Sequence, residues 1–167
     1  MDTYSGHAIF LIGIPSAGKT TAAAEIVARV PSFVVLAVDE LIHRFPQREW
    51  LDRLPQIFDM ALAETNRLMQ TGNVVVDAVW DATQVEYVKE LFGSCGLYVV
   101  MRIDEQERRS REQCRFDRKV HYWDPVWNDK PGPDHLYDLV IDAQANDPAQ
   151  CATLAIAEAE QRWGTPV

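Results

Sequence analysis

The strongest constraint on the fold of this chain is a glycine-rich segment close to its start. Residues 13–20 read GIPSAGKT and match the pattern GxxxxGK[ST]. The apolar run AIFLI at residues 8–12 comes directly before this segment, and an alanine-rich helical pattern begins at Lys19. A strand, a glycine-rich loop and a helix in this order form a phosphate-binding loop, or P-loop. The alternative is a strand-to-helix turn that contains Gly-Lys-Thr by chance.

The P-loop pattern assigns a role to each of its residues. Glycines let the backbone curl so that successive N–H groups point at phosphate oxygens, and the N-terminus of the following helix attracts anions. We expect the Lys19 ammonium to reach the β- and γ-phosphates of ATP, and the Thr20 hydroxyl to bind Mg²⁺. The predicted nucleotide contacts are Gly13, Ser16, Ala17, Gly18, Lys19, Thr20 and Thr21.

Strand and helix patterns alternate along the rest of the chain. Apolar runs predict strands at residues 8–12, 33–38, 74–79, 97–103 and 136–141. Helical spacing predicts helices at residues 19–30, 55–71, 84–92, 105–120 and 148–163. Such alternation is typical of an α/β fold with a parallel sheet and right-handed crossovers. We therefore expect one domain over residues 1–167, with a five-stranded parallel sheet and helices on both of its faces.

The charge of the chain limits its partners. The 167 residues carry a net charge of −9, and the pI is about 4.8. A negative protein repels the phosphate backbone of nucleic acids, so we expect no nucleic-acid partner. No apolar run is long enough to span a bilayer, and the first residues do not resemble a signal peptide. We therefore expect a cytoplasmic protein with no membrane partner, and the sequence indicates no particular oligomeric state.

An acidic pair follows the second predicted strand. Ligands of open α/β sheets bind beyond the carboxyl ends of the strands. Asp39 is therefore our candidate for the carboxylate that orients an acceptor hydroxyl and takes its proton. Its alternative role is the N-cap of a short helix that starts near Leu41. Glu40 is the second candidate for the polar contact.

A second acidic position lies near the end of the third predicted strand. Asp77 is the expected acidic partner of Thr20 in holding Mg²⁺, usually through water. The alternatives for Asp77 are an ion pair with Lys19 or a cap of the strand end. Asp81 follows shortly afterwards, and we interpret it as a turn or N-cap residue.

An arginine-rich segment follows the fourth predicted strand. Residues 104–118 read DEQERRSREQCRFDR, and Arg108, Arg111, Arg115 and Arg118 share one helix face. This helix is either a solvated helix with surface ion pairs or part of a lid around residues 105–135. We favour the lid, with catalytic roles for Arg111 and Arg115, because guanidinium groups stabilise the charge that develops in phosphoryl transfer. The aromatic segment 121–135 is either part of this lid or pocket, or a loop held by aromatic packing.

Together these segments resemble the chloramphenicol phosphotransferase family, a branch of the P-loop kinases related in fold to nucleoside-monophosphate, shikimate and gluconate kinases. The resemblance covers most of the chain. Its matching segments are SAGKT at 16–20, AVDELIHRFP at 37–46, VVVDAVW at 74–80, RIDEQERRSREQCRFDR at 102–118 and HLYDLVIDAQ at 135–144.

The resemblance implies a three-layer P-loop kinase fold with Asp39 as the catalytic base. It also implies that Arg111, Arg115 and Arg118 face the nucleotide phosphates, and that residues 142–147 lie near the adenine. The chain differs from the family's type member at Ile14 and Pro15, and more strongly over residues 43–55. In that region, Arg44, Arg48 and Arg53 either recognise an anionic acceptor or coat an exposed helix.

The sequence thus predicts an ATP- and Mg²⁺-dependent phosphotransferase whose acceptor is a hydroxyl group of a small molecule, such as chloramphenicol or another antibiotic. The nearest alternative is a nucleotide, nucleoside or metabolite kinase, in which Arg44 and Arg48 bind a phosphate of the acceptor. A further alternative, from another class, is a regulator that binds ATP without transferring phosphate. A GTPase is not expected, because the chain has no NKxD-type guanine motif.

Overall fold

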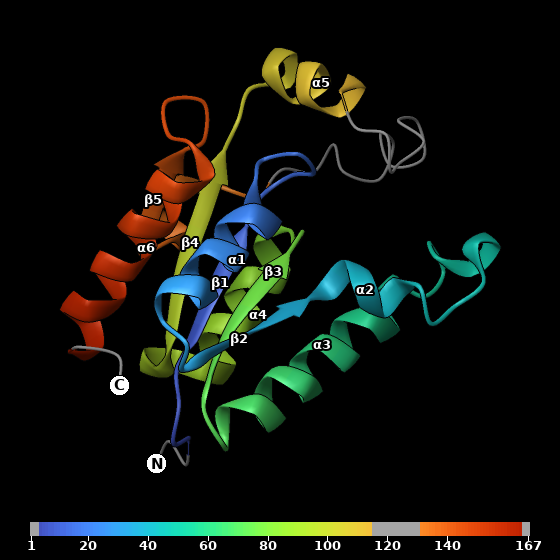
Figure 1. Cartoon of the computed structure of the whole chain (residues 1–167). Helices are drawn as coiled ribbons and strands as arrows, with labels where there is room; N and C mark the ends of the chain where they lie inside the picture. Colours follow the sequence, from blue (N-terminus) through green and yellow to red (C-terminus); the bar gives the residue numbers. More distant parts are fainter. Residues whose placement is uncertain (1–3, 115–130, 165–167) are drawn as a thin grey trace.

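The computed structural model describes residues 4–114 and 131–164. Strands and helices alternate, as the sequence predicts (Figure 1). In chain order the elements are β1 (Ala8–Ile12), α1 (Lys19–Arg29), β2 (Phe33–Ala37), α2 (Val38–Ile42), η1 (Gln47–Glu49), α3 (Leu54–Met69), β3 (Asn73–Ala78), α4 (Ala82–Phe92), η2 (Gly93–Cys95), β4 (Gly96–Arg102), α5 (Glu105–Gln113), η3 (Asp134–Leu136), β5 (Leu139–Asp142) and α6 (Pro148–Trp163).

The sheet confirms the predicted fold class. Its five strands are parallel and have the order β2-β3-β1-β4-β5, with β1 at the centre. The chain passes from β1 to β2 and β3 on one side of the centre, and then to β4 and β5 on the other. Because ligands bind where the strand order reverses, the loop after β1 lies at the favoured position for a ligand site.

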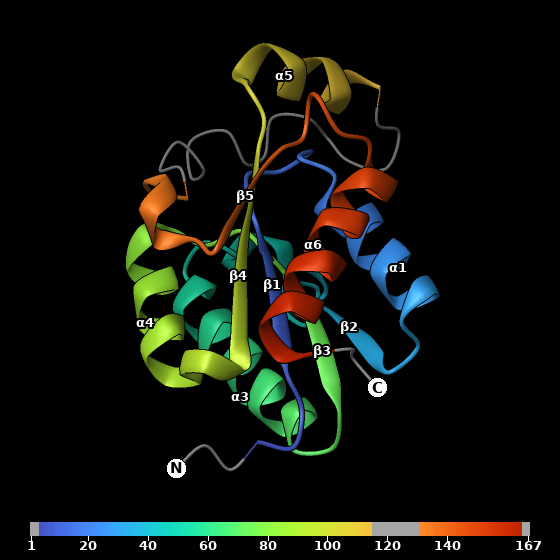
Figure 2. The ribbon, with the colours of Figure 1, turned by 90° about the vertical axis from the view of Figure 1, so that its left-hand side faces the viewer.

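The sheet separates two apolar cores, which explains why the strands read as continuous apolar runs. Alternate β1 side chains enter opposite cores: Phe10 packs toward one, and Ile9 and Leu11 pack toward the other. Figure 2 shows α3 and α4 against one face of the sheet and α1 and α6 against the other. The predicted three-layer arrangement is therefore confirmed.

Four of the five strands differ from their predicted ranges, and at two of them another element takes over part of the range. The second strand ends at Ala37, because Val38 already belongs to the short helix α2. The fifth strand does not extend back to Leu136, since residues 134–136 form a 3-10 turn in which the Tyr137 N–H donates to the carbonyl of Asp134. The helix predicted at residues 105–120 is described to its end at Gln113, and its remainder lies outside the described residues from 115 onward. Within the described part of the chain, no helix has the length and apolar character needed to cross a membrane.

Candidate active site

The P-loop joins the central strand β1 to α1, and its backbone takes conformations that favour glycine. Gly18 has a φ of +91° and serves as the N-cap of α1. Gly13 has no room for a side chain, because a Cβ there would lie 2.7 Å from the carbonyl oxygen of Met101 on β4. Ser16 has a φ of +66° although it is not a glycine. Such a conformation costs about 1–3 kcal/mol unless neighbouring contacts hold it.

Lys19 is directed back over the loop that precedes it. The side chain is 6% exposed, and its Nζ donates to the carbonyl oxygen of Ile14 at 3.1 Å. The same ammonium lies 3.9 Å from the carboxylate of Asp77. It is therefore a buried cation at the mouth of the loop, the position that the pattern predicts for a phosphate contact.

Thr20 and Asp77 come together because α1 begins at the edge where β3 ends. The Thr20 hydroxyl donates to the Asp77 carboxylate at 2.5 Å. Hydroxyl and carboxylate oxygens are hard ligands that suit Mg²⁺, which is usually held by one or two carboxylates, waters and substrate phosphates. The described residues contain no group of three or more His, Cys, Asp or Glu side chains that could hold a metal by themselves. The Thr20–Asp77 pair fits a Mg²⁺ site that nucleotide phosphates complete.

Asp39 lies in the first turn of α2, and the N-cap of this helix is Ala37. The alternative role of Asp39, as N-cap of a helix that starts near Leu41, is therefore wrong. Asp39 is exposed and lines a cavity together with P-loop residues, whereas its neighbour Glu40 does not line that cavity. Asp81, by contrast, is the N-cap of α4, as predicted.

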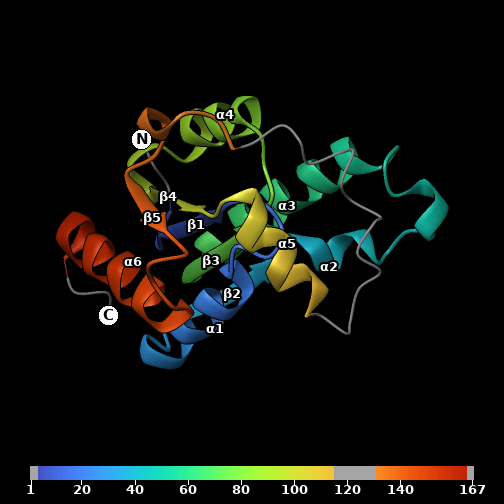
Figure 3. The ribbon, with the colours of Figure 1, turned by 90° about the horizontal axis from the view of Figure 1, so that it is seen from above.

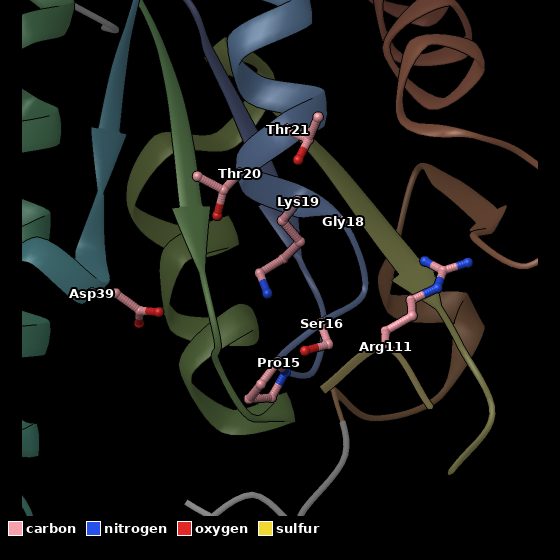
Figure 4. A pocket seen from close by; sticks show the side chains of 8 residues that line it. All are labelled: Pro15, Ser16, Gly18, Lys19, Thr20, Thr21, Asp39 and Arg111. Carbon is pink, nitrogen blue, oxygen red and sulfur yellow. The ribbon is translucent and has the colours of Figure 1, made fainter. Parts of the chain in front are cut away.

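One cavity of about 230 Å³ brings most of the predicted side chains together. In Figure 4 the Lys19 ammonium lies between Asp39 on one side and Arg111 on the other, and all three residues line the cavity. Of the predicted contacts, Gly13 and Ala17 are buried within the loop and do not line this cavity. The lining residues are Pro15, Ser16, Gly18, Lys19, Thr20, Thr21, Asp39 and Arg111.

Helix α5 crosses above the carboxyl end of the sheet, near β1 and β3 (Figure 3). The guanidinium of Arg111 donates to the carbonyl oxygen of Ala143 at 2.7 Å and to Glu107 at 2.8 Å. Arg108, on the predicted arginine face, pairs with Glu105 at 2.7 Å. The helix thus carries surface ion pairs, and Arg111 lines the cavity, whereas the lid stays a prediction. The other predicted arginines, Arg115 and Arg118, lie outside the described residues.

The structure describes three further predicted segments, one of them only in part. Arg53 donates to Glu49 at 3.0 Å and its guanidinium lies 5.4 Å from the centre of the Phe45 ring, so it is engaged in local packing. The Arg48 side chain is 86% exposed. Of the aromatic segment 121–135, residues 121–130 lie outside the described residues. Residues 142–147, expected near an adenine, form a turn held by the Asp142 side chain and supply the Ala143 carbonyl that binds Arg111.

Sequence reasoning missed Glu112 on α5. Its carboxylate is buried and accepts a hydrogen bond from the hydroxyl of Ser16 in the P-loop. The spacing of the arginines indicates a role for the cations of this helix. No local feature of the sequence distinguishes Glu112 from the other acidic residues around it. Its position beside Arg111 was the one available signal.

Comparisons with known proteins agree with this architecture. A family model described as chloramphenicol phosphotransferase-like protein matches residues 6–160. No curated protein matches the chain.

Three similar solved structures are kinases that share the fold at low identity. A sugar kinase from Janibacter sp. HTCC2649 has a TM-score of 0.74 at 13% identity, covering 93% of this chain and 95% of its own. The APS kinase of Mycobacterium tuberculosis, in complex with AMPPNP and APS, has a TM-score of 0.70 at 16% identity, with coverages of 93% and 98%. A gluconokinase from Sinorhizobium meliloti 1021 has a TM-score of 0.69 at 16% identity, with coverages of 95% and 93%.

Proposed function

Because this chain belongs to the chloramphenicol phosphotransferase-like protein family, we propose that it transfers the γ-phosphoryl group of ATP to a hydroxyl group of a small molecule. The acceptor class is that of an antibiotic such as chloramphenicol or of a metabolite alcohol. The proposal includes a single domain with a lid around residues 105–135, action in the cytoplasm, and no nucleic-acid or membrane partner.

The observation that carries the proposal is the cavity above the P-loop. It combines a buried cation, Lys19, with a second cation, Arg111, and an exposed carboxylate, Asp39. Phosphoryl transfer needs positive charge around the transferred group and a carboxylate within reach of the acceptor hydroxyl. Both requirements have candidates in this one cavity.

In the proposed mechanism, the P-loop backbone and Lys19 bind the β- and γ-phosphates. Arg111 is held over the same cavity by Ala143 and Glu107, where its fixed charge stabilises the oxygens of the transferred group. Thr20 and Asp77 would hold Mg²⁺, which would supply positive charge to the phosphates.

Asp39 orients the acceptor hydroxyl and takes its proton as the new oxygen–phosphorus bond forms and the bond to the departing ADP breaks. The proton then leaves Asp39 for solvent, to which this exposed carboxylate has access. Catalysis of this kind depends on position and electrostatics, because no covalent intermediate on the protein is needed.

The test measures ADP release from MgATP against a panel of hydroxylated compounds, with product mass checked for one added phosphate. The panel contains chloramphenicol, other antibiotics, sugars, shikimate and nucleoside monophosphates. We expect Asp39→Asn to lower turnover by about 10²–10⁴-fold, the range for loss of a general base, with ATP affinity retained.

The matched control is Glu40→Gln, which removes one carboxylate from the same helix outside the cavity. Full activity of Asp39→Asn together with loss in Glu40→Gln would move the base to Glu40. If the wild-type chain binds ATP and phosphorylates no compound of the panel, a regulator that binds ATP without transferring phosphate becomes the better description of this protein.

A further inference from the structure

A buried carboxylate contacts the P-loop in addition to the side chains assigned above. Glu112 of α5 is 5% exposed and accepts a hydrogen bond from the Oγ of Ser16. The two residues lie 96 positions apart, so the contact joins the P-loop to a different part of the chain. A negative charge beside a phosphate site opposes the binding of anions. We therefore expect the buried Glu112 carboxylate to make a favourable contribution that outweighs this repulsion.

The conformation of Ser16 suggests the first part of that role. Among the residues that the structure describes, Ser16 is the one non-glycine residue with a positive φ. Glycine adopts this conformation without a steric penalty, whereas serine needs contacts that hold it there. The hydrogen bond to Glu112 fixes the Ser16 side chain and thereby favours the backbone conformation that directs the loop N–H groups.

The position of α5 suggests the second part. Two adjacent residues of the helix reach different elements, in addition to the contact of its N-cap Asp104 with Gln144. Arg111 binds the carbonyl of Ala143 after β5, and Glu112 binds Ser16 after β1. Loss of the Glu112 contact would remove the bond between α5 and the P-loop and would loosen the helix that carries Arg111 to the cavity.

We propose that Glu112 is a positioning residue for nucleotide binding. By accepting the Ser16 hydrogen bond, it holds Ser16 in the left-handed conformation and holds α5 so that the Arg111 guanidinium and the P-loop N–H groups face the same phosphates. This inference rests on the proposed function for the identity of the ligand, a nucleoside triphosphate. It does not depend on the acceptor or on the transfer step.

The test compares MgATP affinity, measured by titration calorimetry, in variants of both residues. Glu112→Ala removes the acceptor, and we expect about tenfold weaker binding, the factor that corresponds to loss of one good hydrogen bond. Glu112→Gln keeps an acceptor oxygen and removes the charge, so it binds at least as tightly as the wild type. The control is Glu105→Gln, which changes the charge of the same helix equally and acts on surface ion pairs with Arg108 and Arg109.

Variants of Ser16 leave the Glu112 charge in place and test how the loop conformation affects affinity for MgATP. Ser16→Ala keeps the Cβ and loses the hydrogen bond, so its affinity falls as in Glu112→Ala, and the double variant binds no more weakly than either single variant. Ser16→Gly also loses the contact but adopts the positive φ freely. It therefore binds more tightly than Ser16→Ala.

Hydrogen exchange of the backbone amides at residues 14–18 gives a second readout that needs no nucleotide. Exchange becomes faster in Glu112→Ala and stays at the wild-type rate in Glu112→Gln. The inference is overturned if Glu112→Ala binds MgATP as tightly as the wild type, if Glu112→Gln loses as much as Glu112→Ala, or if loop exchange is unchanged. Failure of the proposed function gives a different result, namely no phosphorylated product from a wild-type protein whose loop exchange still responds to Glu112→Ala.

Discussion

Asp77 contacts both residues with which the sequence associates it. It accepts the Thr20 hydroxyl at 2.5 Å and lies 3.9 Å from the Lys19 ammonium. In the sequence analysis, an ion pair with Lys19 is the alternative to a Mg²⁺ role for Asp77. The two arrangements do not exclude each other. This carboxylate holds together a lysine and a threonine that both line the P-loop cavity.

The residue-scale prediction is that Asp77→Asn raises the Mg²⁺ concentration needed for half-maximal turnover about 10–100-fold, the usual effect of losing a carboxylate that orients a metal site. Turnover is measured at saturating ATP over a Mg²⁺ titration. The matched control is Asp81→Asn, which changes charge equally a few residues away and keeps an N-cap side chain. An unchanged Mg²⁺ requirement in Asp77→Asn would remove Asp77 from the metal site.

At the scale of elements, α4 and α6 begin at a local capping signal, whereas α2 is held by packing. The predicted start of α6 is correct, and that of α4, residue 84, is two residues late. Asp81 and Asp147 each form a capping box with a glutamine three residues later, and Pro148 occupies the first turn of α6. The short helix α2 has no side-chain N-cap, and its residues continue an apolar strand pattern. Its existence depends on burial of Val38, Leu41 and Ile42 against the core.

The element-scale prediction concerns α4. Asp81→Ala removes a side chain that accepts the Gln84 N–H at 2.9 Å, so we expect the free energy of unfolding to fall by about 1 kcal/mol. Urea denaturation measures this change, and Asp81→Asn should retain most of the stability because asparagine also caps helices. Equal losses in the two variants would show that the charge, and not the cap, is responsible.

At the scale of the whole molecule, the first and last described segments lie at the amino end of the sheet, opposite α5 (Figure 1). The ring of His7 stacks on Trp163 at 4.3 Å, and the indole N–H of Trp163 donates to the Ser94 carbonyl at 3.0 Å. The Nδ1 of His7 is buried and has no hydrogen-bond partner among the described residues. Burial lowers the pKa of His7 below its usual 6.5.

The whole-molecule prediction follows from that pKa. Since the folded state binds the His7 proton less readily than the unfolded state, stability is retained above pH 6.5 and falls as the pH is lowered from there toward the pKa of the folded state. His7→Phe keeps an aromatic ring against Trp163 and removes the titration. Urea unfolding at pH 7.5 and 5.5 should therefore show a smaller loss of stability in His7→Phe than in the wild type. Equal losses in both proteins would contradict the prediction.

The features of the fold and site that could be predicted are those whose sequence signals lie within one short stretch of the chain. The P-loop, the apolar strands and the capped helices each occupy a continuous stretch, so their residues could be assigned from spacing alone. The boundary of the second strand and the extent of the fifth were wrong, because apolar side chains are needed equally in a strand, in the buried helix α2 and in the turn at residues 134–136. The site roles of Asp39 and Arg111 stay predictions, although the cavity brings both together.

The sequence by itself determined the parallel α/β fold and the place of the P-loop, because a strand, a glycine-rich turn and a helix are specified by neighbouring residues. Only the tertiary structure decided that Asp39 lies inside α2 and that Ser16 is bonded to Glu112 across 96 positions. Contacts of this second kind depend on the order of the strands and on the packing of α5 above them. No spacing along the chain encodes which side chains meet there.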